Sequence, residues 1–359
     1  MISYLQYFLI AIIIIVLTKI NICFPICVNK KRCNFIGWFF EWFILTFLAS
    51  VRCVGDNFGG ADAANYAFYY FRDGNVDKSE KLFYYIGIIV RKFTDNYHIY
   101  FFVIYGIIVF SFLFFAYKIF KEDVSFAELF LYANIYVSSY GIMRQWLAIS
   151  IMMVAVILTT EKKYKSAIIV SIFSVFIHTS MILIVVILAG VYVLEIFSIQ
   201  INSKTLLLLA LMCNLVSFCG QTIIKQLISK TDYIVYLDLE YSWLGYIPAI
   251  VFMIVFLLFG DVLAQKHEGD KIVIYFIFAN LALVYIAVAL GMFRVMVVFI
   301  PIRIYAVYLL KESFLEKIVI GNGKYSIMNL LYSIVIFLDG CLLMWRTIAA
   351  GALPLVVTV

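Results

Sequence analysis

Long apolar blocks and short polar links follow one another along the whole chain. Each block holds about 15–22 residues, which is the length that an α-helix needs to cross the hydrocarbon core of a bilayer. The blocks lack the two-residue alternation of barrel strands, and a helix is the other element that satisfies its own backbone in lipid. We therefore predict an all-α, polytopic membrane protein with about twelve transmembrane helices.

The predicted spans follow the apolar blocks, and residues 1–359 are expected to form a single membrane domain. The approximate bounds of the spans are 3–22, 35–51, 97–117, 126–140, 143–160, 165–177, 180–197, 205–219, 243–259, 272–290, 295–310 and 326–344. Two longer polar segments, 52–96 and 220–242, separate spans. Within the first, Leu82–Phe93 is apolar enough to lie in the membrane interface as a helix. Since long loops are often functional, we expect the site on the side that holds both segments.

Composition supports a membrane protein and argues against other classes. Hydrophobic residues make up 66% of the chain and charged residues 13%, whereas soluble domains carry about 25% charged residues. The net charge of +6 is spread over short loops, so no nucleic-acid partner is expected. The seven cysteines show no zinc spacing, and no nucleotide-binding glycine pattern appears. We expect neither a metal nor a cofactor.

The distribution of basic residues predicts how the chain is oriented in the membrane. They concentrate in alternate links, and cytoplasmic loops carry the excess of Lys and Arg. The groups that fall on one side are Lys30–Arg32, Lys118 and Lys121, Lys162–Lys165, Lys266 and Lys271, and Lys311 to Lys324. That side is predicted to be cytoplasmic, so segments 52–96 and 220–242 and both termini are expected outside.

Two arginines lie between spans with almost no loop around them. Arg144 follows Tyr140-Gly141-Ile142-Met143, and Arg294 follows Gly291-Met292-Phe293. A charge near the hydrocarbon is costly, and the planar guanidinium suits a phosphate group. The alternative is that these side chains extend to the outer headgroups without binding a substrate.

A histidine and a group of polar residues are further candidates. His178 lies at the outer turn of a helical hairpin, where it could accept a proton or simply bond a carbonyl. Asp56 and Asp62, with Asn65 and Tyr66, form a set suited to sugar hydroxyls, in a glycine-rich stretch that brings backbone close to a ligand. The alternative there is a solvated loop that caps a helix.

The order of these motifs resembles the EpsG-like family of bacterial polysaccharide polymerases, which is related to the Wzy-type O-antigen polymerases. The resemblance covers most of the chain, roughly from Arg52 to Arg303, and Asp62 fits the family's aspartate better than Asp56 by its spacing to Tyr66. The motifs are Arg52 with Gly55-Asp56, Asp62-x-x-Asn65-Tyr66, Glu80-Lys81-Leu82-Phe83, Arg144-Gln145-x-Leu147-Ala148, Phe176-Ile177-His178-x-Ser180 and Phe293-Arg294.

This resemblance implies a glycosyltransferase of the bacterial cytoplasmic (inner) membrane with its active site facing the periplasm or outside. Its fold would resemble the multispanning, lipid-phosphate-dependent (GT-C-like) glycosyltransferases. It would transfer an undecaprenyl-pyrophosphate-linked glycan onto the terminal sugar of another lipid-linked repeat unit, for O-antigen, capsule or exopolysaccharide synthesis. A chain-length regulator and a flippase would be its further partners.

The expected roles follow this chemistry. His178 is the first choice as catalytic base and Asp62 the second. A single displacement would invert the anomeric centre, since no pair of carboxylates demands a covalent intermediate. The residues expected to bind pyrophosphate are Arg144, Arg294 and Arg52, and those expected to bind the rest of the substrate are Asp56, Asn65, Tyr66 and Gln145.

Two other functions are compatible with the sequence. A transporter or flippase of a lipid-linked sugar could use buried charges, although transporters often show internal repeats and midplane sites, and the halves of this chain show no repeat. A membrane acyltransferase could modify surface polysaccharide with a histidine, but its donor chemistry would usually face the cytoplasm. The side of the membrane on which His178 lies would separate that function from polymerisation.

Overall fold

The structure is a computed structural model. It describes residues 35–55, 62–71, 80–120, 135–230, 247–266, 271–289 and 294–315, with short pieces before residue 34 and residues 356–357. Contacts divide the chain into two compact units. The first unit comprises Met1–Ile157, Ile169–Ile182 and Lys324–Val359, and the second comprises Leu158–Ile168 and Leu183–Gly323.

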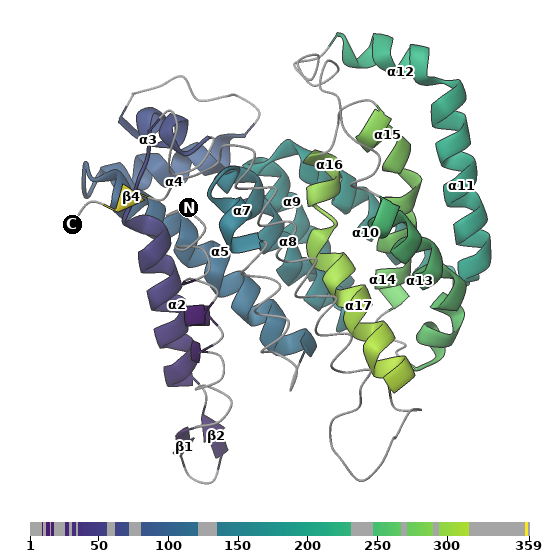
Figure 1. Cartoon of the computed structure of the whole chain (residues 1–359), viewed down its shortest axis with the longest axis horizontal. Coiled ribbons are helices and arrows are strands. Elements are labelled where there is room, and N and C mark those ends of the chain that lie inside the picture. The colour runs from purple at the N-terminus through teal and green to yellow at the C-terminus, as the bar shows by residue number, and fades with distance from the viewer. Residues whose placement is uncertain are drawn as a thin grey trace. The chain divides into compact units, whose positions relative to one another are not determined.

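The described part is mostly helical (Figure 1). In the first half of the chain the helices are α2 (Phe35–Ser50), α3 (Ala63–Phe71), α4 (Lys81–Arg91), α5 (Tyr97–Phe120), α7 (Val137–Ser139), α8 (Met143–Thr160) and α9 (Tyr164–Ile177). After a short 3-10 turn, Thr179–Met181, follow α10 (Ile182–Ile196), α11 (Ser203–Cys219), α12 (Gln221–Ile228), α13 (Ile247–Lys266), α14 (Lys271–Ala282), α15 (Val284–Ala289), α16 (Arg294–Val297) and α17 (Ile300–Leu315). Two short antiparallel strand pairs accompany them, β1 (Ile26–Val28) with β2 (Lys31–Cys33) and β3 (Arg52–Cys53) with β4 (Val356–Val357).

The helix bounds agree with many of the predicted spans. Helix α8 has the predicted bounds 143–160, and α4 confirms that the apolar stretch Leu82–Phe93 is largely helical. Two predicted spans are broken, because 272–290 contains both α14 and α15 and 295–310 contains both α16 and α17. The predicted spans that lie wholly or mostly outside the described residues are 3–22, 126–140 and 326–344.

Three of the described helical segments are long and apolar enough to cross a membrane, namely Tyr97–Phe120, Met143–Thr160 and Thr179–Ile196. Helices α11 and α12 meet at an angle of 73°, and they count as a fourth candidate if they form one span. Five further apolar helical segments have 10–17 residues. A membrane protein therefore fits, while the number of twelve spans stays a prediction.

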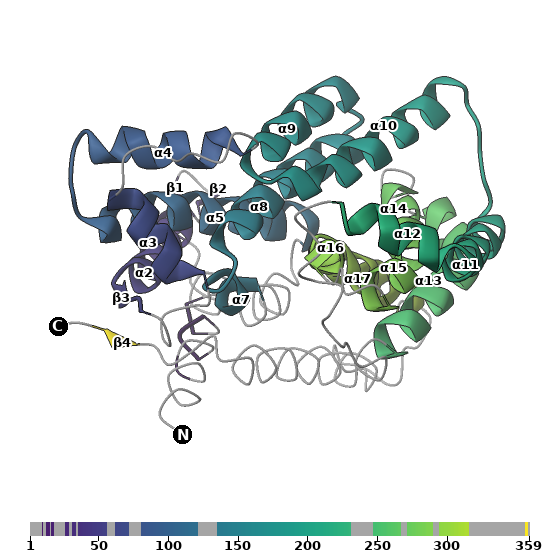
Figure 2. The ribbon, with the colours of Figure 1, turned by 90° about the horizontal axis from the view of Figure 1, so that it is seen from above.

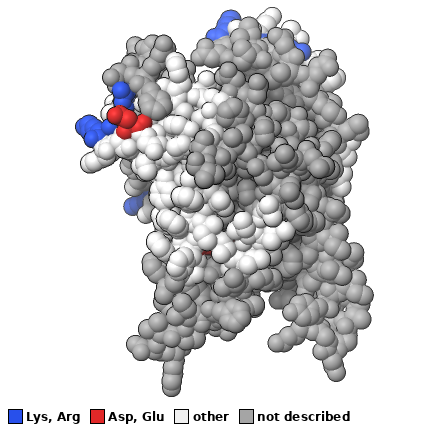
Figure 3. All heavy atoms as spheres, turned by 60° about the vertical axis from the view of Figure 1, so that its left-hand side comes forward, with Lys and Arg blue, Asp and Glu red and all other residues white. Residues whose placement is uncertain are grey.

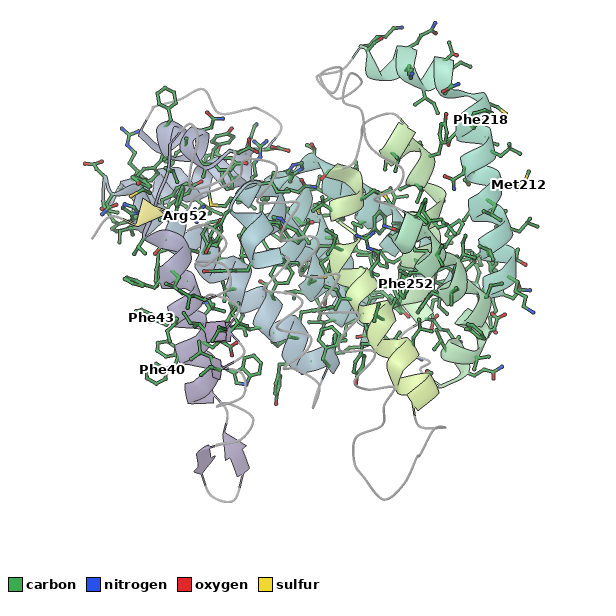
Figure 4. All side chains as sticks on the ribbon, in the orientation of Figure 1. Phe40, Phe43, Arg52, Met212, Phe218 and Phe252 are labelled. Carbon is green, nitrogen blue, oxygen red and sulfur yellow. The ribbon has the colours of Figure 1, made fainter. Side chains whose placement is uncertain are left out.

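The outward face of α2 is apolar. Phe39, Phe40, Phe43 and Phe47 are between 43% and 55% exposed, and Phe40 and Phe43 point away from the neighbouring helices in Figure 4. On the face shown in Figure 3, most charged side chains of described residues lie toward the upper end, and few appear lower down. Large exposed apolar patches are rare on soluble monomers but are expected where a helix faces lipid.

The inward face of α2 packs closely on α5. The indole Nε1 of Trp42 donates a hydrogen bond to the carbonyl oxygen of Gly106 at 2.8 Å. A methyl group at Gly106 would lie 3.3 Å from the Trp42 ring, so glycine permits this contact. Small residues at helix crossings serve this purpose in membrane proteins. Figure 2 shows that α3 and α4 lie beside α5. Helix α5 therefore supports the two helices that adjoin the candidate site described below.

In the second unit, a side chain bridges the break between α14 and α15. The Asn214 amide on α11 donates to the Leu281 carbonyl at 2.8 Å, and its oxygen accepts the Tyr285 N–H at 2.8 Å. In an unbroken helix Tyr285 N–H would bond Leu281 directly. Asn214 therefore satisfies both backbone groups that the break releases, as a chain within a bilayer requires.

Candidate active site

Four segments of the first unit meet around Arg144. Arg144 lies on the first turn of α8, directly after the turn that contains Gly141. The Asp62 backbone N–H donates to the Gly141 carbonyl oxygen at 3.0 Å, so the start of α3 lies beside the start of α8. Arg144 keeps 23% of its side chain exposed. A cation held at the start of a helix, partly open to solvent, can bind an anion.

Glu80 is the buried carboxylate of this site. It directly precedes α4 and is 4% exposed. Its Oε2 lies 2.7 Å from Arg144 Nη1, and its Oε1 accepts the Thr179 backbone N–H at 3.0 Å and the Thr179 hydroxyl at 3.2 Å. One side chain thus joins the start of α4 to α8 and to the turn after α9.

His178 lies at this same turn. Its backbone is extended, with φ −150° and ψ 120°, and it ends α9 just before the 3-10 turn. Its Nδ1 accepts the Ser180 backbone N–H at 3.2 Å and lies 3.0 Å from the Ser180 hydroxyl oxygen. The same nitrogen lies 3.5 Å from Glu80 Oε1, and 12% of the His178 side chain is exposed. The structure therefore brings the predicted residues Arg144 and His178 together through Glu80.

Arg52 occupies a different environment. It is completely buried, and its guanidinium donates to the Ala49 carbonyl and to the Tyr105 hydroxyl, the latter at 2.9 Å. Its central carbon lies 4.9 Å from the ring centre of Phe101, 4.7 Å from that of Tyr105 and 4.4 Å from that of Tyr140. Aromatic faces stabilise a cation that is withdrawn from water. This placement favours a structural role for Arg52 over the predicted contact with pyrophosphate.

The structure describes the side chains of some of the remaining predicted residues but not of all. On α3, Asn65 is exposed and Tyr66 is half-buried, with its ring centre 5.3 Å from that of Phe83. Gln145 is 1% exposed on α8. Asp56 lies outside the described residues, and Arg294 begins α16 in the second unit, with its side chain outside the described part.

Glu80 is the residue that sequence reasoning missed as a site member. It entered the sequence analysis only as part of the motif that begins the amphipathic segment. The available signal was a single carboxylate directly ahead of an apolar helix, and at that position a favourable interaction with the helix dipole is the usual explanation. In the structure the Glu80 side chain makes no capping bond to α4 and bonds Thr179 instead. In the part of the chain that is described, no three His, Cys, Asp or Glu side chains could hold a metal ion.

A model of the EpsG family matches residues 38–355 of the chain, which include all the site residues described above. No curated protein and no solved structure matches the chain.

Proposed function

Because the chain belongs to the EpsG family, which indicates a polysaccharide polymerase of the membrane, we propose that it joins undecaprenyl-pyrophosphate-linked repeat units. The observation that carries this proposal is the cluster around Arg144, in which a partly exposed arginine, a histidine and the Asp62 segment adjoin. A lipid pyrophosphate is a leaving group that needs cationic stabilisation, and Arg144 can supply it.

The reaction is a single displacement. The hydroxyl oxygen of the acceptor sugar forms a bond to the anomeric carbon of the donor glycan, and the bond from that carbon to the pyrophosphate oxygen breaks. The electron pair of the broken bond stays on the pyrophosphate, whose charge Arg144 stabilises. The hydroxyl proton moves to a base, for which His178 and Asp62 are the candidates. One displacement inverts the anomeric centre, and the base later releases the proton to water.

The membrane setting agrees with this chemistry. Both substrates are tethered to lipid, so the reacting groups meet at headgroup depth. We propose that the site faces the outside of the bacterial cytoplasmic membrane, with a flippase supplying substrate and a chain-length regulator acting on the product. A GT-C-like architecture and a total of about twelve spans remain part of this proposal.

Transport is the strongest competing function, because transporters use broken helices to bind substrates through released backbone groups. The break between α14 and α15 does not offer such groups, since the Asn214 side chain already bonds Leu281 and Tyr285. This observation favours a structural explanation of the break.

The deciding experiment is the glycan profile of a strain that lacks the chain. Lipid-linked single repeats without a polymer ladder on the outer face are expected, and the wild-type chain should restore the ladder. Single repeats trapped on the cytoplasmic face would indicate a flippase. A full ladder with an altered acyl content would indicate an acyltransferase, and an unchanged ladder and composition would refute the proposed function.

A further inference from the structure

Both oxygens of the Glu80 carboxylate are occupied by protein groups. Oε2 pairs with Arg144, and Oε1 accepts two hydrogen bonds from Thr179. The side chain is only 5% exposed, so a sugar hydroxyl has little access to it. A buried carboxylate persists where charges and donors compensate it, and here each compensating group belongs to the site. Glu80 is thus suited to place other residues and unsuited to take a proton from substrate.

The contacts of the His178 ring favour one tautomer. The Ser180 backbone N–H points at Nδ1, which accepts it at 3.2 Å. A neutral imidazole carries one N–H, and the nitrogen that accepts a hydrogen bond is the one without the proton. Glu80 Oε1 also faces Nδ1, but at 3.5 Å it lies beyond the usual hydrogen-bond length, whereas the Ser180 N–H lies at 3.2 Å. The geometry therefore favours the tautomer with its proton on Nε2. If Nδ1 carried the proton, the ring N–H and the Ser180 N–H would be two donors that face each other.

From these contacts we infer that Glu80 is a positioning residue that holds Arg144 and the 178–180 turn together, and that His178 donates a hydrogen bond through Nε2–H. This inference rests on the proposed polymerase function and refines it. A neutral His178 with its proton on Nε2 has no free lone pair there, so it does not accept the hydroxyl proton. That proton goes to the Asp62 carboxylate instead. His178 and Arg144 then both donate to the oxygens of the departing pyrophosphate.

The tautomer can be measured directly, because the chain has only three histidines, His98, His178 and His267. His98 is an internal control, because its expected tautomer is the opposite of that expected for His178. Its Nδ1 lies 2.6 Å from the Ser50 carbonyl oxygen, which can only accept, so Nδ1 of His98 carries the proton. Signals of His178 and His267 are assigned by their loss in His178→Gln and His267→Gln.

The experiment is a solid-state ¹⁵N spectrum of histidine-labelled protein in lipid bilayers, at a pH well above the ordinary imidazole pKa of about 6.5. We expect a protonated Nε2 for His178 and a protonated Nδ1 for His98 in the same spectrum. A protonated Nδ1 on His178 would overturn the donor role, whether or not any variant folds.

The positioning role is tested with Glu80→Gln, which keeps the shape and one acceptor for Thr179 but loses the charge that holds Arg144. The probe is undecaprenyl pyrophosphate without sugar, and its Kd is measured with the protein in lipid nanodiscs. Because a displaced guanidinium loses charge-assisted hydrogen bonds to the phosphates, we expect the Kd to rise by roughly 10-fold to 10²-fold. Glu80→Asp should recover part of the affinity, since it keeps the charge.

Glu161→Gln is the matched control. Glu161 also pairs with a cation at 2.7 Å, Lys163, but this pair is exposed and lies at the far end of α8. Loss of the Glu161–Lys163 pair should leave the Kd for undecaprenyl pyrophosphate unchanged. Wild-type affinity in folded Glu80→Gln would overturn the positioning role. If the deletion strain keeps its ladder, the proposed function itself fails, whereas a ladder restored fully by Glu80→Gln contradicts only this inference.

Discussion

The Glu80 carboxylate lies 2.7 Å from the Arg144 guanidinium and forms an ion pair with it. The Arg144 side chain is 23% exposed, so it is partly open to solvent at this site. An ammonium group is a point charge and cannot pair with a carboxylate and a phosphate in the same fixed geometry. The pair therefore predicts that the identity of this cation matters as well as its charge.

We expect Arg144→Lys to shorten or abolish the polymer ladder at matched protein level, and the same outcome for Arg294→Lys if Arg294 also binds pyrophosphate. The measurement is gel analysis of surface polysaccharide from complemented deletion strains. Arg91→Lys at the end of α4 is the control, because Arg91 is also a helix-terminal arginine but lies outside the site. Full-length ladders from Arg144→Lys would contradict the assignment of pyrophosphate binding to Arg144.

Substitution of Arg52 should lower stability, because its contacts are structural. Its charge is balanced inside the protein by the Tyr105 hydroxyl, the Ala49 carbonyl and three aromatic rings. Arg52→Ala would leave these acceptors without their donor, which typically costs about 1–3 kcal/mol for each buried group. We expect lower thermal stability in detergent and less folded protein. If folded Arg52→Ala instead shows normal stability and weaker binding of undecaprenyl pyrophosphate, Arg52 contacts the substrate.

Asn214 gives a separate stability test in the second unit. Asn214→Leu keeps a similar volume but leaves Tyr285 N–H and Leu281 C=O without their partner. An unsatisfied backbone group costs about 1–3 kcal/mol when it is fully buried and less at a part-buried position such as this one, so the midpoint of thermal unfolding should fall. Leu215→Ala on the same helix is the control, because Leu215 is 53% exposed and faces outward. Equal stability of the two variants would show that the α14–α15 break does not depend on Asn214.

Apolar blocks predicted where most helices lie, because the length of a span and its hydrophobicity are local properties of the chain. The start of α8 at Met143 and its end at Thr160 agree with the prediction for this reason. The break after Leu281 was not predictable in this way, since the residue that stabilises it, Asn214, belongs to another helix. A block that is apolar throughout gives no sign of where its backbone bonds are interrupted.

In the site, too, the features that depend on local sequence were predictable, and those that depend on distant residues were not. Arg144 and His178 stood out because charge and imidazole are unusual beside apolar blocks, and the structure places both near Glu80. The burial of Arg52 could not be predicted, because its aromatic neighbours Phe101 and Tyr140 come from distant parts of the chain. The role of Glu80 depends on Thr179, which lies 99 residues away, so sequence spacing gave no hint of the contact.

The predicted orientation can be tested with two exposed lysines. Lys92 follows α4 in the segment expected outside, and Lys163 lies between α8 and α9 in a link expected in the cytoplasm. In a variant without native cysteines, Lys92→Cys should react with an impermeant thiol reagent in intact cells, and Lys163→Cys should react only after permeabilisation. The reverse labelling would place the site around Arg144 on the cytoplasmic side.

The final prediction separates the two candidate bases. If Asp62 accepts the hydroxyl proton, Asp62→Asn keeps the shape of the side chain but removes its basicity. Its kcat should fall by roughly 10²–10⁴-fold, with KM little changed. His178→Gln keeps an N–H donor and should retain more activity than His178→Leu, which loses the donor and should fall by about 10²–10³-fold.

The assay uses purified protein in liposomes, with lipid-linked single repeats extracted from the deletion strain as substrate. Saturating substrate distinguishes a lost chemical step from weakened binding, because only the second is recovered as substrate is raised. Full activity of Asp62→Asn, together with equal loss in His178→Gln and His178→Leu, would assign the base to His178. Such a result would require His178 to leave its bond with Ser180 during turnover, and the ¹⁵N spectrum with bound undecaprenyl pyrophosphate would then show the proton on Nδ1.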